Sequence, residues 1–164
     1  MKNVISSPFN AVLGSIHIPS SKSISNRMLI IRALAGSVAP LLNLSESDDT
    51  VVLGKALDTE EAVKDVGHAG TAMRFLAAYL STQAGKVTLT GSQRMKQRPI
   101  GPLVDALKQV GAQIKYLENE GYPPLRISGE ALTGRSIEIE AGISSQFISA
   151  LMMIGPVGGA VRTR

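Results

Sequence analysis

The chain has 164 residues and a formal net charge of +4, and 44% of its residues are hydrophobic while 18% are charged. This composition supports one folded core and argues against disorder. The absence of cysteine excludes disulfides, thiolate metal sites and a cysteine nucleophile.

The first half of the chain predicts one strand and three helices. Alternating apolar residues over 12–18 indicate the strand. Apolar residues then recur at helical spacing from Ile24 to Ala35, and the sequence Ser-Glu-Ser-Asp-Asp-Thr supplies an N-cap for a helix around 49–58. The third helix is expected within 67–85, with one apolar face formed by Met73, Leu76, Ala77 and Leu80.

The second half alternates short strands with two helices. Strands are expected at 86–91, 112–118, 124–129 and 135–142. A helix over 98–111 has Pro99 suited to its first turn and Gly111 to its end. The last helix, 144–156, is expected to stop at Gly155 and Pro156. The intermixed order predicts an α/β (α+β) fold.

The stretch Pro-Ser-Ser-Lys-Ser-Ile-Ser-Asn-Arg at 19–27 places Lys22 and Arg27 among four serines, just before the first helix. Cations there oppose the helix dipole, whereas unpaired N–H groups and hydroxyls at a helix start bind anions. The alternative is that single serines are caps and the cations are solvated. Taken together, the group favours an anion site.

The same pattern occurs a second time near the end of the chain. Residues 20–30 and 144–154 are identical at six of eleven aligned positions, and each segment follows a strand with alternating isoleucines. Each copy therefore places paired serines at a strand-to-helix corner. We expect the two corners to face a common ligand.

Two further helix entrances carry candidate residues. Gly70 opens a helix and leaves room for a ligand at the backbone, although a tight turn capped by Thr71 explains it equally well. Residues 94–100 concentrate Arg94, Lys96 and Arg98 before a helix. Such a cluster is usually a solvated face, but its position at a helix start favours a functional role.

Acidic and histidine residues point to no further site. Asp48 and Asp49 are interpreted as caps of their own helix rather than as acid–base residues. His17 and His68 lack the spacing of metal ligands, so no metal is expected.

Four stretches in order, residues 19–27, 69–74, 94–107 with 121–127, and 144–153, resemble the N-terminal part of 5-enolpyruvylshikimate-3-phosphate synthase (3-phosphoshikimate 1-carboxyvinyltransferase). The resemblance covers nearly the whole chain. It implies two similar domains built from repeated βαβαββ units. It further implies that residues 1–15 are a strand that packs with the second domain, that residues 16–164 form a partial N-terminal domain, and that the C-terminal catalytic domain is absent.

The family transfers the enolpyruvyl group of phosphoenolpyruvate to the 5-hydroxyl of shikimate 3-phosphate and releases phosphate, without a metal or organic cofactor. By resemblance, Lys22 contacts both substrates and the charge that develops between them. The other substrate-binding residues that the resemblance implies are Ser23, Arg27, Ser144 and Ser145 for shikimate 3-phosphate, Gln146 near both ligands, and Gly70 and Arg98 for phosphoenolpyruvate and the inhibitor glyphosate.

The chain departs from the family pattern at His68, where the family often has Asn, and at Phe75, where it often has Pro. The segment from Asp49 to Gly70 is also shorter than usual, so a strand or two is expected to be missing there. With the acid–base carboxylates of the second domain absent, we expect substrate binding without turnover. Residues 1–15 are expected to be poorly tied down or to pair with another copy.

Two alternative functions remain open at this point. A UDP-sugar enolpyruvyl transferase commonly uses a loop cysteine, which this chain lacks. A basic nucleic-acid-binding module fits the net charge, but only 4% of the residues are aromatic, which disfavours base stacking. No membrane association is expected, because no apolar run approaches a span and the N-terminus lacks signal-peptide features. We expect a cytoplasmic protein.

Overall fold

The computed structural model describes residues 14–15, 18–130, 132, 136–140, 142–158 and 161–163. The strand predicted over 12–18 and the segment 1–15 lie largely outside these residues. Gly14, Ser15 and Ile18, which are described, are not in a strand.

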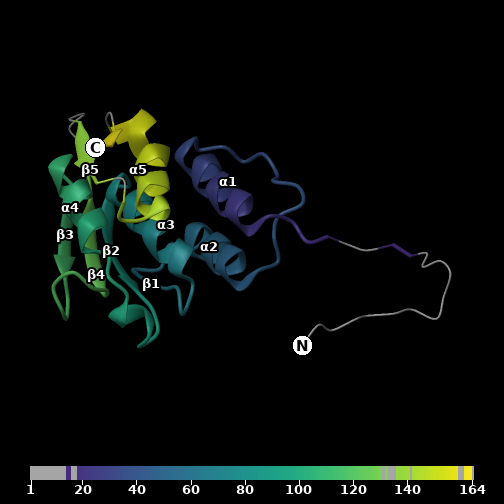
Figure 1. Ribbon diagram of the computed structural model, residues 1–164, viewed down its shortest axis with the longest axis horizontal. Coiled ribbons are helices and arrows are strands. Elements are labelled where there is room, and N and C mark those ends of the chain that lie inside the picture. The colour runs from purple at the N-terminus through teal and green to yellow at the C-terminus, as the bar shows by residue number, and fades with distance from the viewer. Residues whose placement is uncertain are drawn as a thin grey trace, which may run out of the picture.

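A four-stranded mixed sheet organises the middle of the chain (Figure 1). The strand order is β1-β2-β4-β3, with β1 parallel to β2 and the other neighbours antiparallel. A parallel pair needs a crossover connection, and helix α3 (Gly70–Ser81) supplies the one between β1 and β2. In chain order the elements are β1 (Val63–Asp65), α3 (Gly70–Ser81), β2 (Gly85–Thr90), α4 (Gly101–Gln109), β3 (Gln113–Tyr116) and β4 (Leu125–Gly129). This order is one complete βαβαββ unit, as the resemblance to the family implied.

Side chains alternate between the two faces of this sheet. Val87 and Ile114 lie opposite Ile127 in register and face the helices, where Ile114 and Ile127 are buried. The intervening residues Lys115 and Arg126 lie opposite each other on the other face and are exposed. The sheet therefore has one face in the core and one in solvent, which is common for antiparallel pairs.

Helix α3 lies at the centre of the molecule, between the sheet and the helices α1 (Lys22–Leu34), α2 (Asp48–Asp58) and α5 (Ser145–Gly158) (Figure 1). The sequence predicted a single apolar face. Instead every residue of α3 except Tyr79 is buried, because neighbours pack on all its sides.

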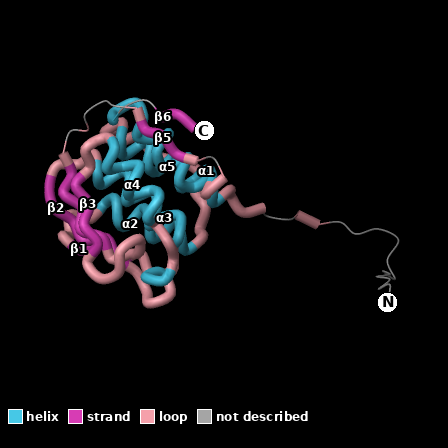
Figure 2. The backbone as a smooth tube through the Cα atoms, turned by 60° about the vertical axis from the view of Figure 1, so that its left-hand side comes forward, coloured by secondary structure: helices cyan, strands magenta, loops and turns pink. Residues whose placement is uncertain are grey.

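The last elements repeat the start of the complete unit. Strands β5 (Ile137–Ile139) and β6 (Val161–Thr163) pair in parallel and are connected by α5, as β1 and β2 are by α3 (Figure 2). The two-stranded sheet lies beside the helices, away from the four-stranded one. The predicted repetition of units is thus present in the topology.

Several predicted boundaries were wrong. Helix α5 continues through Gly155 and Pro156, because a proline near the helix end removes only one N–H bond of the final turn. Helix α4 begins at Gly101 with Pro102 in its first turn, whereas Pro99 lies after the short 3-10 helix η1 (Met95–Gln97). Strand β1 lies between Asp49 and Gly70, where the residue pattern had located no strand.

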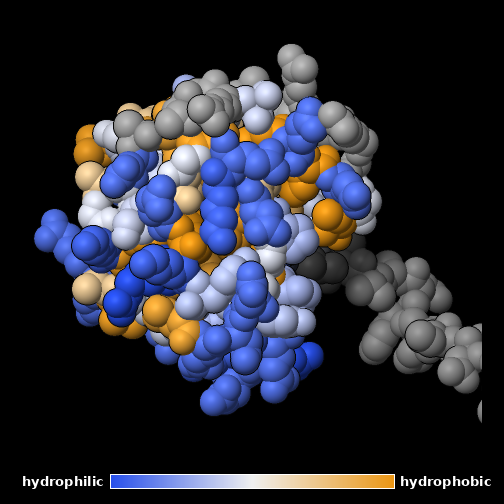
Figure 3. All heavy atoms as spheres, turned by 90° about the vertical axis from the view of Figure 1, so that its left-hand side faces the viewer, coloured by the Kyte–Doolittle hydropathy of each residue, from blue (hydrophilic) through white to orange (hydrophobic). Residues whose placement is uncertain are grey.

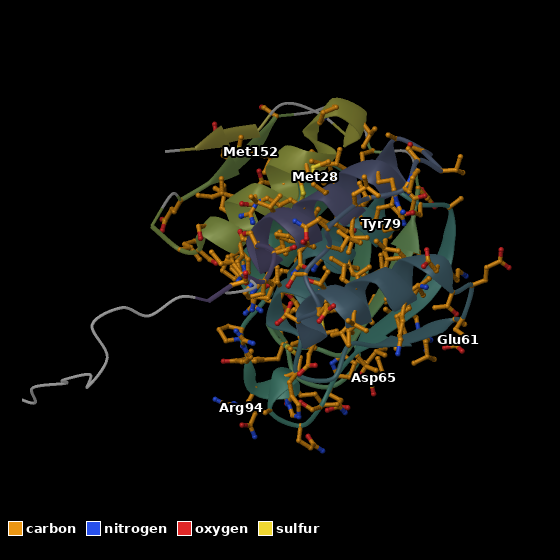
Figure 4. All side chains as sticks on the ribbon, turned by 90° about the vertical axis from the view of Figure 1, so that its right-hand side faces the viewer. Met28, Glu61, Asp65, Tyr79, Arg94 and Met152 are labelled. Atoms are coloured by element: carbon orange, nitrogen blue, oxygen red, sulfur yellow. The ribbon has the colours of Figure 1, made fainter. Side chains whose placement is uncertain are left out.

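The surface is mostly hydrophilic on the side seen in Figure 3, with hydrophobic residues visible between polar ones. Helix α1 differs, because Ile24, Met28 and Ile31 are exposed while Leu29 and Ile30 are buried. Figure 4 shows Met28 of α1 and Met152 of α5 on the same side of the molecule. An apolar groove of about 530 Å³ lies there, lined by both helices. Among the described residues, no helix combines the length and the hydropathy of a membrane span.

Candidate functional site

The start of α1 is built from neighbouring residues. The Oγ of Ser21 accepts a hydrogen bond from the backbone N–H of Ile24 at 3.3 Å, which satisfies one unpaired donor of the first turn. Ser20 donates to Oδ1 of Asn43 at 2.6 Å. Ser20 and Ser21 are therefore both engaged in hydrogen bonds. Lys22 is the cation at the first position of the helix.

Lys22 contacts the start of a second helix through Asp49. Its Nζ lies 3.4 Å from Oδ2 of Asp49, and Oδ1 of Asp49 accepts the backbone N–H of Thr71 at 3.1 Å. Asp49 was interpreted as a cap of its own helix, but the N-cap of α2 is Ser47, with no side-chain cap bond. Asp49 instead caps α3, whose own N-cap, Ala69, has no side chain able to do so.

The start of α5 joins the same group. Nε2 of Gln146 donates to Oγ1 of Thr71 at 3.3 Å, and Oγ of Ser144 accepts the N–H of Gln146 at 3.3 Å. First-turn residues of α1, α2, α3 and α5 therefore meet through Lys22, Asp49, Thr71 and Gln146. These four residues form one polar corner of the molecule. The positive ends of four helix dipoles converge here, which favours an anion.

Arg98 lies directly over the start of α3. A Cβ built on Gly70 would lie 2.8 Å from Cζ of Arg98, so a side chain at this position would displace the Arg98 guanidinium. The buried Arg74 donates to the carbonyl of Gly70 at 2.7 Å and stacks on Phe147 at 5.6 Å. Burial lowers the pKa of Arg74, the Arg98 guanidinium lowers it further, and the Asp49 carboxylate opposes both.

Arg27 joins α1 to α5 beside this corner. Nη1 donates to the carbonyl of Ser23 at 2.9 Å and to its Oγ, and Nη2 donates to Oγ of Ser149 at 2.7 Å. The guanidinium lies 5.5 Å from the ring centroid of Phe75, which is fully buried. Two candidate residues, Ser23 and Arg27, thus bind each other, and the aromatic Phe75 supports the pair.

The structure brings most of the sequence-predicted residues to one corner. Lys22, Gly70, Arg98 and Gln146 are connected through the contacts above, and Ser144 caps the adjoining helix. Ser145 is exposed at the first position of α5.

Sequence reasoning missed Asp49 and Thr71 as part of this corner. Residues that are 22 positions apart in the chain show no local pattern, so only the packing of α2 against α3 reveals their contact.

The chemistry of this corner is positioning and charge stabilisation. Lys22 and Arg98 supply full positive charges, and the helix starts add oriented N–H groups. Within the described part of the chain, no group of three His, Cys, Asp or Glu residues could hold a metal ion.

Comparisons with known proteins relate the chain to one family of enzymes. The family model described as EPSP synthase (3-phosphoshikimate 1-carboxyvinyltransferase) matches residues 51–162. A 3-phosphoshikimate 1-carboxyvinyltransferase of Bacteroides fragilis strain YCH46 is 54% identical over 157 residues, which are 96% of this chain and 38% of the relative. One from Aliivibrio fischeri strain ES114 is 43% identical over 183 residues, covering 96% of this chain and 43% of the relative.

A solved structure shares the fold. EPSP synthase from Acinetobacter baumannii superposes with a TM-score of 0.76 at 22% sequence identity, over 92% of this chain and 40% of that one. The chain spans about two fifths of the length of the curated relatives that it matches.

Proposed function

The chain belongs to the EPSP synthase (3-phosphoshikimate 1-carboxyvinyltransferase) family, and on that premise we propose that it serves the transfer of the enolpyruvyl group from phosphoenolpyruvate to shikimate 3-phosphate. This reaction is a step of the shikimate pathway toward aromatic amino acids. The chain spans about two fifths of the length of its relatives, so the activity is stated here as a proposal.

One observation carries the proposal: the starts of α1, α2, α3 and α5 meet at Lys22, Asp49, Thr71 and Gln146. Both proposed substrates are polyanions, and convergent helix starts with added cations favour anions. Lys22 is half-exposed, so its ammonium can exchange Asp49 for a ligand oxygen.

Within this site, the proposed division of roles follows the two sides of the corner. Ser23, Arg27, Ser144 and Ser145 lie on the starts of α1 and α5 or beside them, and they are proposed to hold shikimate 3-phosphate. Gly70 and Arg98 lie at the start of α3 and are proposed to hold phosphoenolpyruvate. Lys22 and Gln146 lie between these sides and are proposed to contact both.

We expect this chain to bind substrate without turning it over. Asp49 is the carboxylate that contacts the corner, and both of its oxygens are engaged by Lys22 and by the Thr71 N–H. A general acid or base needs a proton site that faces the ligand. The residues of this corner are therefore proposed to bind and position the substrates. Proton transfer is assigned to groups outside the corner. We retain the expectation of a cytoplasmic location as part of this proposal.

Isothermal titration with shikimate 3-phosphate tests the proposal. The parent chain should bind, and Lys22→Ala should weaken binding about tenfold, because a charge-assisted contact is lost. Lys86→Ala is the matched control, since Lys86 lies on the sheet in a separate surface hollow and should bind like the parent. Absence of binding, or equal weakening by both variants, contradicts the proposal.

One observation favours a second candidate, a nucleic-acid-binding module. Lys86, Lys115 and Arg126 line a hollow on the solvent face of the sheet, with Lys115 directly opposite Arg126. Like charges placed opposite each other destabilise a strand pair unless an anion screens them. Binding of single-stranded DNA that falls steeply with salt and is lost in Lys115→Ala would favour this candidate.

A further inference from the structure

A buried polar contact joins α1 to α2 one turn after Lys22. The hydroxyl of Thr50 donates to Oδ1 of Asn26 at 2.7 Å, and the two residues are 3% and 0% exposed. A hydroxyl can both donate and accept, so this pairing holds for either orientation of the Asn26 amide. Among the described residues, Nδ2 of Asn26 has no partner, so the contact with Thr50 is the one that engages this amide. Neither residue is among the binding residues proposed above.

Further hydrogen bonds fix the segment that leads into α2. Oγ of Ser25 accepts the backbone N–H of Ser45 at 2.9 Å, and both residues are buried. Oγ of Ser47 lies 3.1 Å from Oγ1 of Thr50, and either hydroxyl can donate. The start of α2 is therefore attached to two consecutive residues of α1, Ser25 and Asn26. The two helices lie next to each other, and α2 also packs against α3 (Figure 1).

This attachment lies beside the polar corner. Lys22 and Asn26 share one face of α1, since residues four positions apart are neighbours on a helix. On α2, Thr50 directly follows Asp49. One oxygen of Asp49 lies 3.4 Å from Nζ of Lys22, and the other accepts the N–H of Thr71 at 3.1 Å. A small shift of α2 relative to α1 would therefore lengthen one of these contacts beyond hydrogen-bond distance.

We propose that Asn26 and Thr50 are positioning residues for Lys22. Their buried contact fixes α2 against α1, and this holds the Asp49 carboxylate where it keeps the Lys22 ammonium at the corner. A lysine side chain has many rotamers, and a ligand that must first order it binds less tightly. Asp49 orders the ammonium before the ligand arrives, so the ligand meets a cation that is already in place.

Amide hydrogen exchange tests the positioning without a ligand. Thr50→Val replaces the hydroxyl by a methyl group and should accelerate exchange of the Thr71 N–H about fivefold, because Asp49 is no longer held beside it. The reference is the N–H of Leu103 in the first turn of α4, which donates to the carbonyl of Ile100 at 3.1 Å. It should exchange as in the parent. Equal acceleration of both amides, or acceleration of neither, overturns the proposal.

Isothermal titration with shikimate 3-phosphate tests the consequence for binding. Thr50→Val should weaken binding about fivefold, because the ligand must then order Lys22 itself. Thr50→Ser keeps the hydroxyl and should bind within about twofold of the parent. Thr88→Val is the matched control, since Thr88 is a half-buried residue of strand β2 and should bind like the parent. A loss in Thr50→Ser or in Thr88→Val as large as in Thr50→Val overturns the proposal.

A double-mutant cycle separates positioning from a general loss of structure. In the Lys22→Ala background, Thr50→Val should leave the affinity unchanged, because no ammonium remains to be ordered. The same fivefold loss in both backgrounds would show a structural effect only and overturns the proposal. If circular dichroism shows that Thr50→Val does not fold, Thr50→Ala carries the same comparison, since it also lacks the hydroxyl and alanine favours a helix.

The inference rests on the proposed function only for the ligand that Lys22 receives, and the two can fail separately. If the parent does not bind shikimate 3-phosphate while Thr50→Val selectively accelerates exchange at Thr71, the proposed function is wrong and the positioning stands. If the parent binds through Lys22 but Thr50→Val binds equally well, the proposed function stands and the inference is wrong.

Discussion

The starts of α1 and α3 lie at the same corner but are assembled differently. Helix α1 is capped by Ser21, which directly precedes it. Helix α3 has no side-chain cap of its own and receives the Asp49 carboxylate from α2 instead. The first arrangement depends on residues close in sequence, and the second depends on how two helices pack.

This difference has a functional consequence. Because Gly70 has no side chain, the Arg98 guanidinium can lie directly over the first residues of α3. The cap at α1 is local, so Lys22 is free to reach across to Asp49. One helix start thus supplies a half-exposed cation, while the other has a cap that comes from a neighbouring helix.

The largest expected effect comes from Phe75, the α3 side chain that lies beneath Arg27 of α1. Phe75→Ala should lower the free energy of unfolding by about 3–5 kcal/mol, because a fully buried ring is replaced by a cavity. Urea denaturation followed by circular dichroism measures this. Met152→Ala, at a side chain that is 63% exposed, should change stability by less than about 0.5 kcal/mol. Similar losses in both variants would contradict the packing role assigned to the buried Phe75 ring.

A smaller loss is expected at the borrowed cap. Asp49→Ala should lower the free energy of unfolding by about 1–2 kcal/mol, because the Thr71 N–H loses its acceptor. The exposed neighbour Asp48 provides the control, and Asp48→Ala should cost less than about 1 kcal/mol. If the two variants were equally stable, Asp49 would act only through the dipole of α2 and not as a cap of α3.

The local cap should contribute about as much as an ordinary N-cap. Ser21→Ala is expected to lower the free energy of unfolding by about 1 kcal/mol, whereas Ser21→Asp keeps an acceptor for the Ile24 N–H and should stay close to the parent. Chemical denaturation of the three proteins decides this. A loss in Ser21→Asp as large as in Ser21→Ala would mean that the hydroxyl is not the cap.

The sheet offers a reference region away from both helix starts. Burial first, then Asp105 and Glu120, raise the pKa of Tyr116 from its usual 10.0 to about 12. The folded state therefore retains this proton longer than the unfolded state. The contribution of Tyr116 to stability is complete below about pH 10 and falls between about pH 10 and about pH 12. Tyr116→Phe should flatten the decline of stability over that range, and an unchanged decline would refute the assignment.

Much of the fold could be predicted because its causes are local. Apolar spacing and turn residues located all five α-helices and four of the strands among the described residues, to within a few positions. Strands β1 and β6 were not located, because Val63–Asp65 and Val161–Thr163 lack the alternating isoleucine pair that marks the equally short β5. The apolar stripe of Ile24, Met28 and Ile31 was read correctly as helical, but nothing in its period indicates that this face is exposed.

The sequence by itself determined that anion-binding residue types stand at several helix starts, since serines, glycine and cations next to apolar periodicity are visible in the chain. Only the tertiary structure decided which of them meet. Asp49, which was predicted to cap its own helix, instead contacts Lys22 and the start of α3. His68 lines a cavity together with two arginines. Contacts between residues distant in sequence arise from helix packing around α3, and no local pattern of residues encodes them.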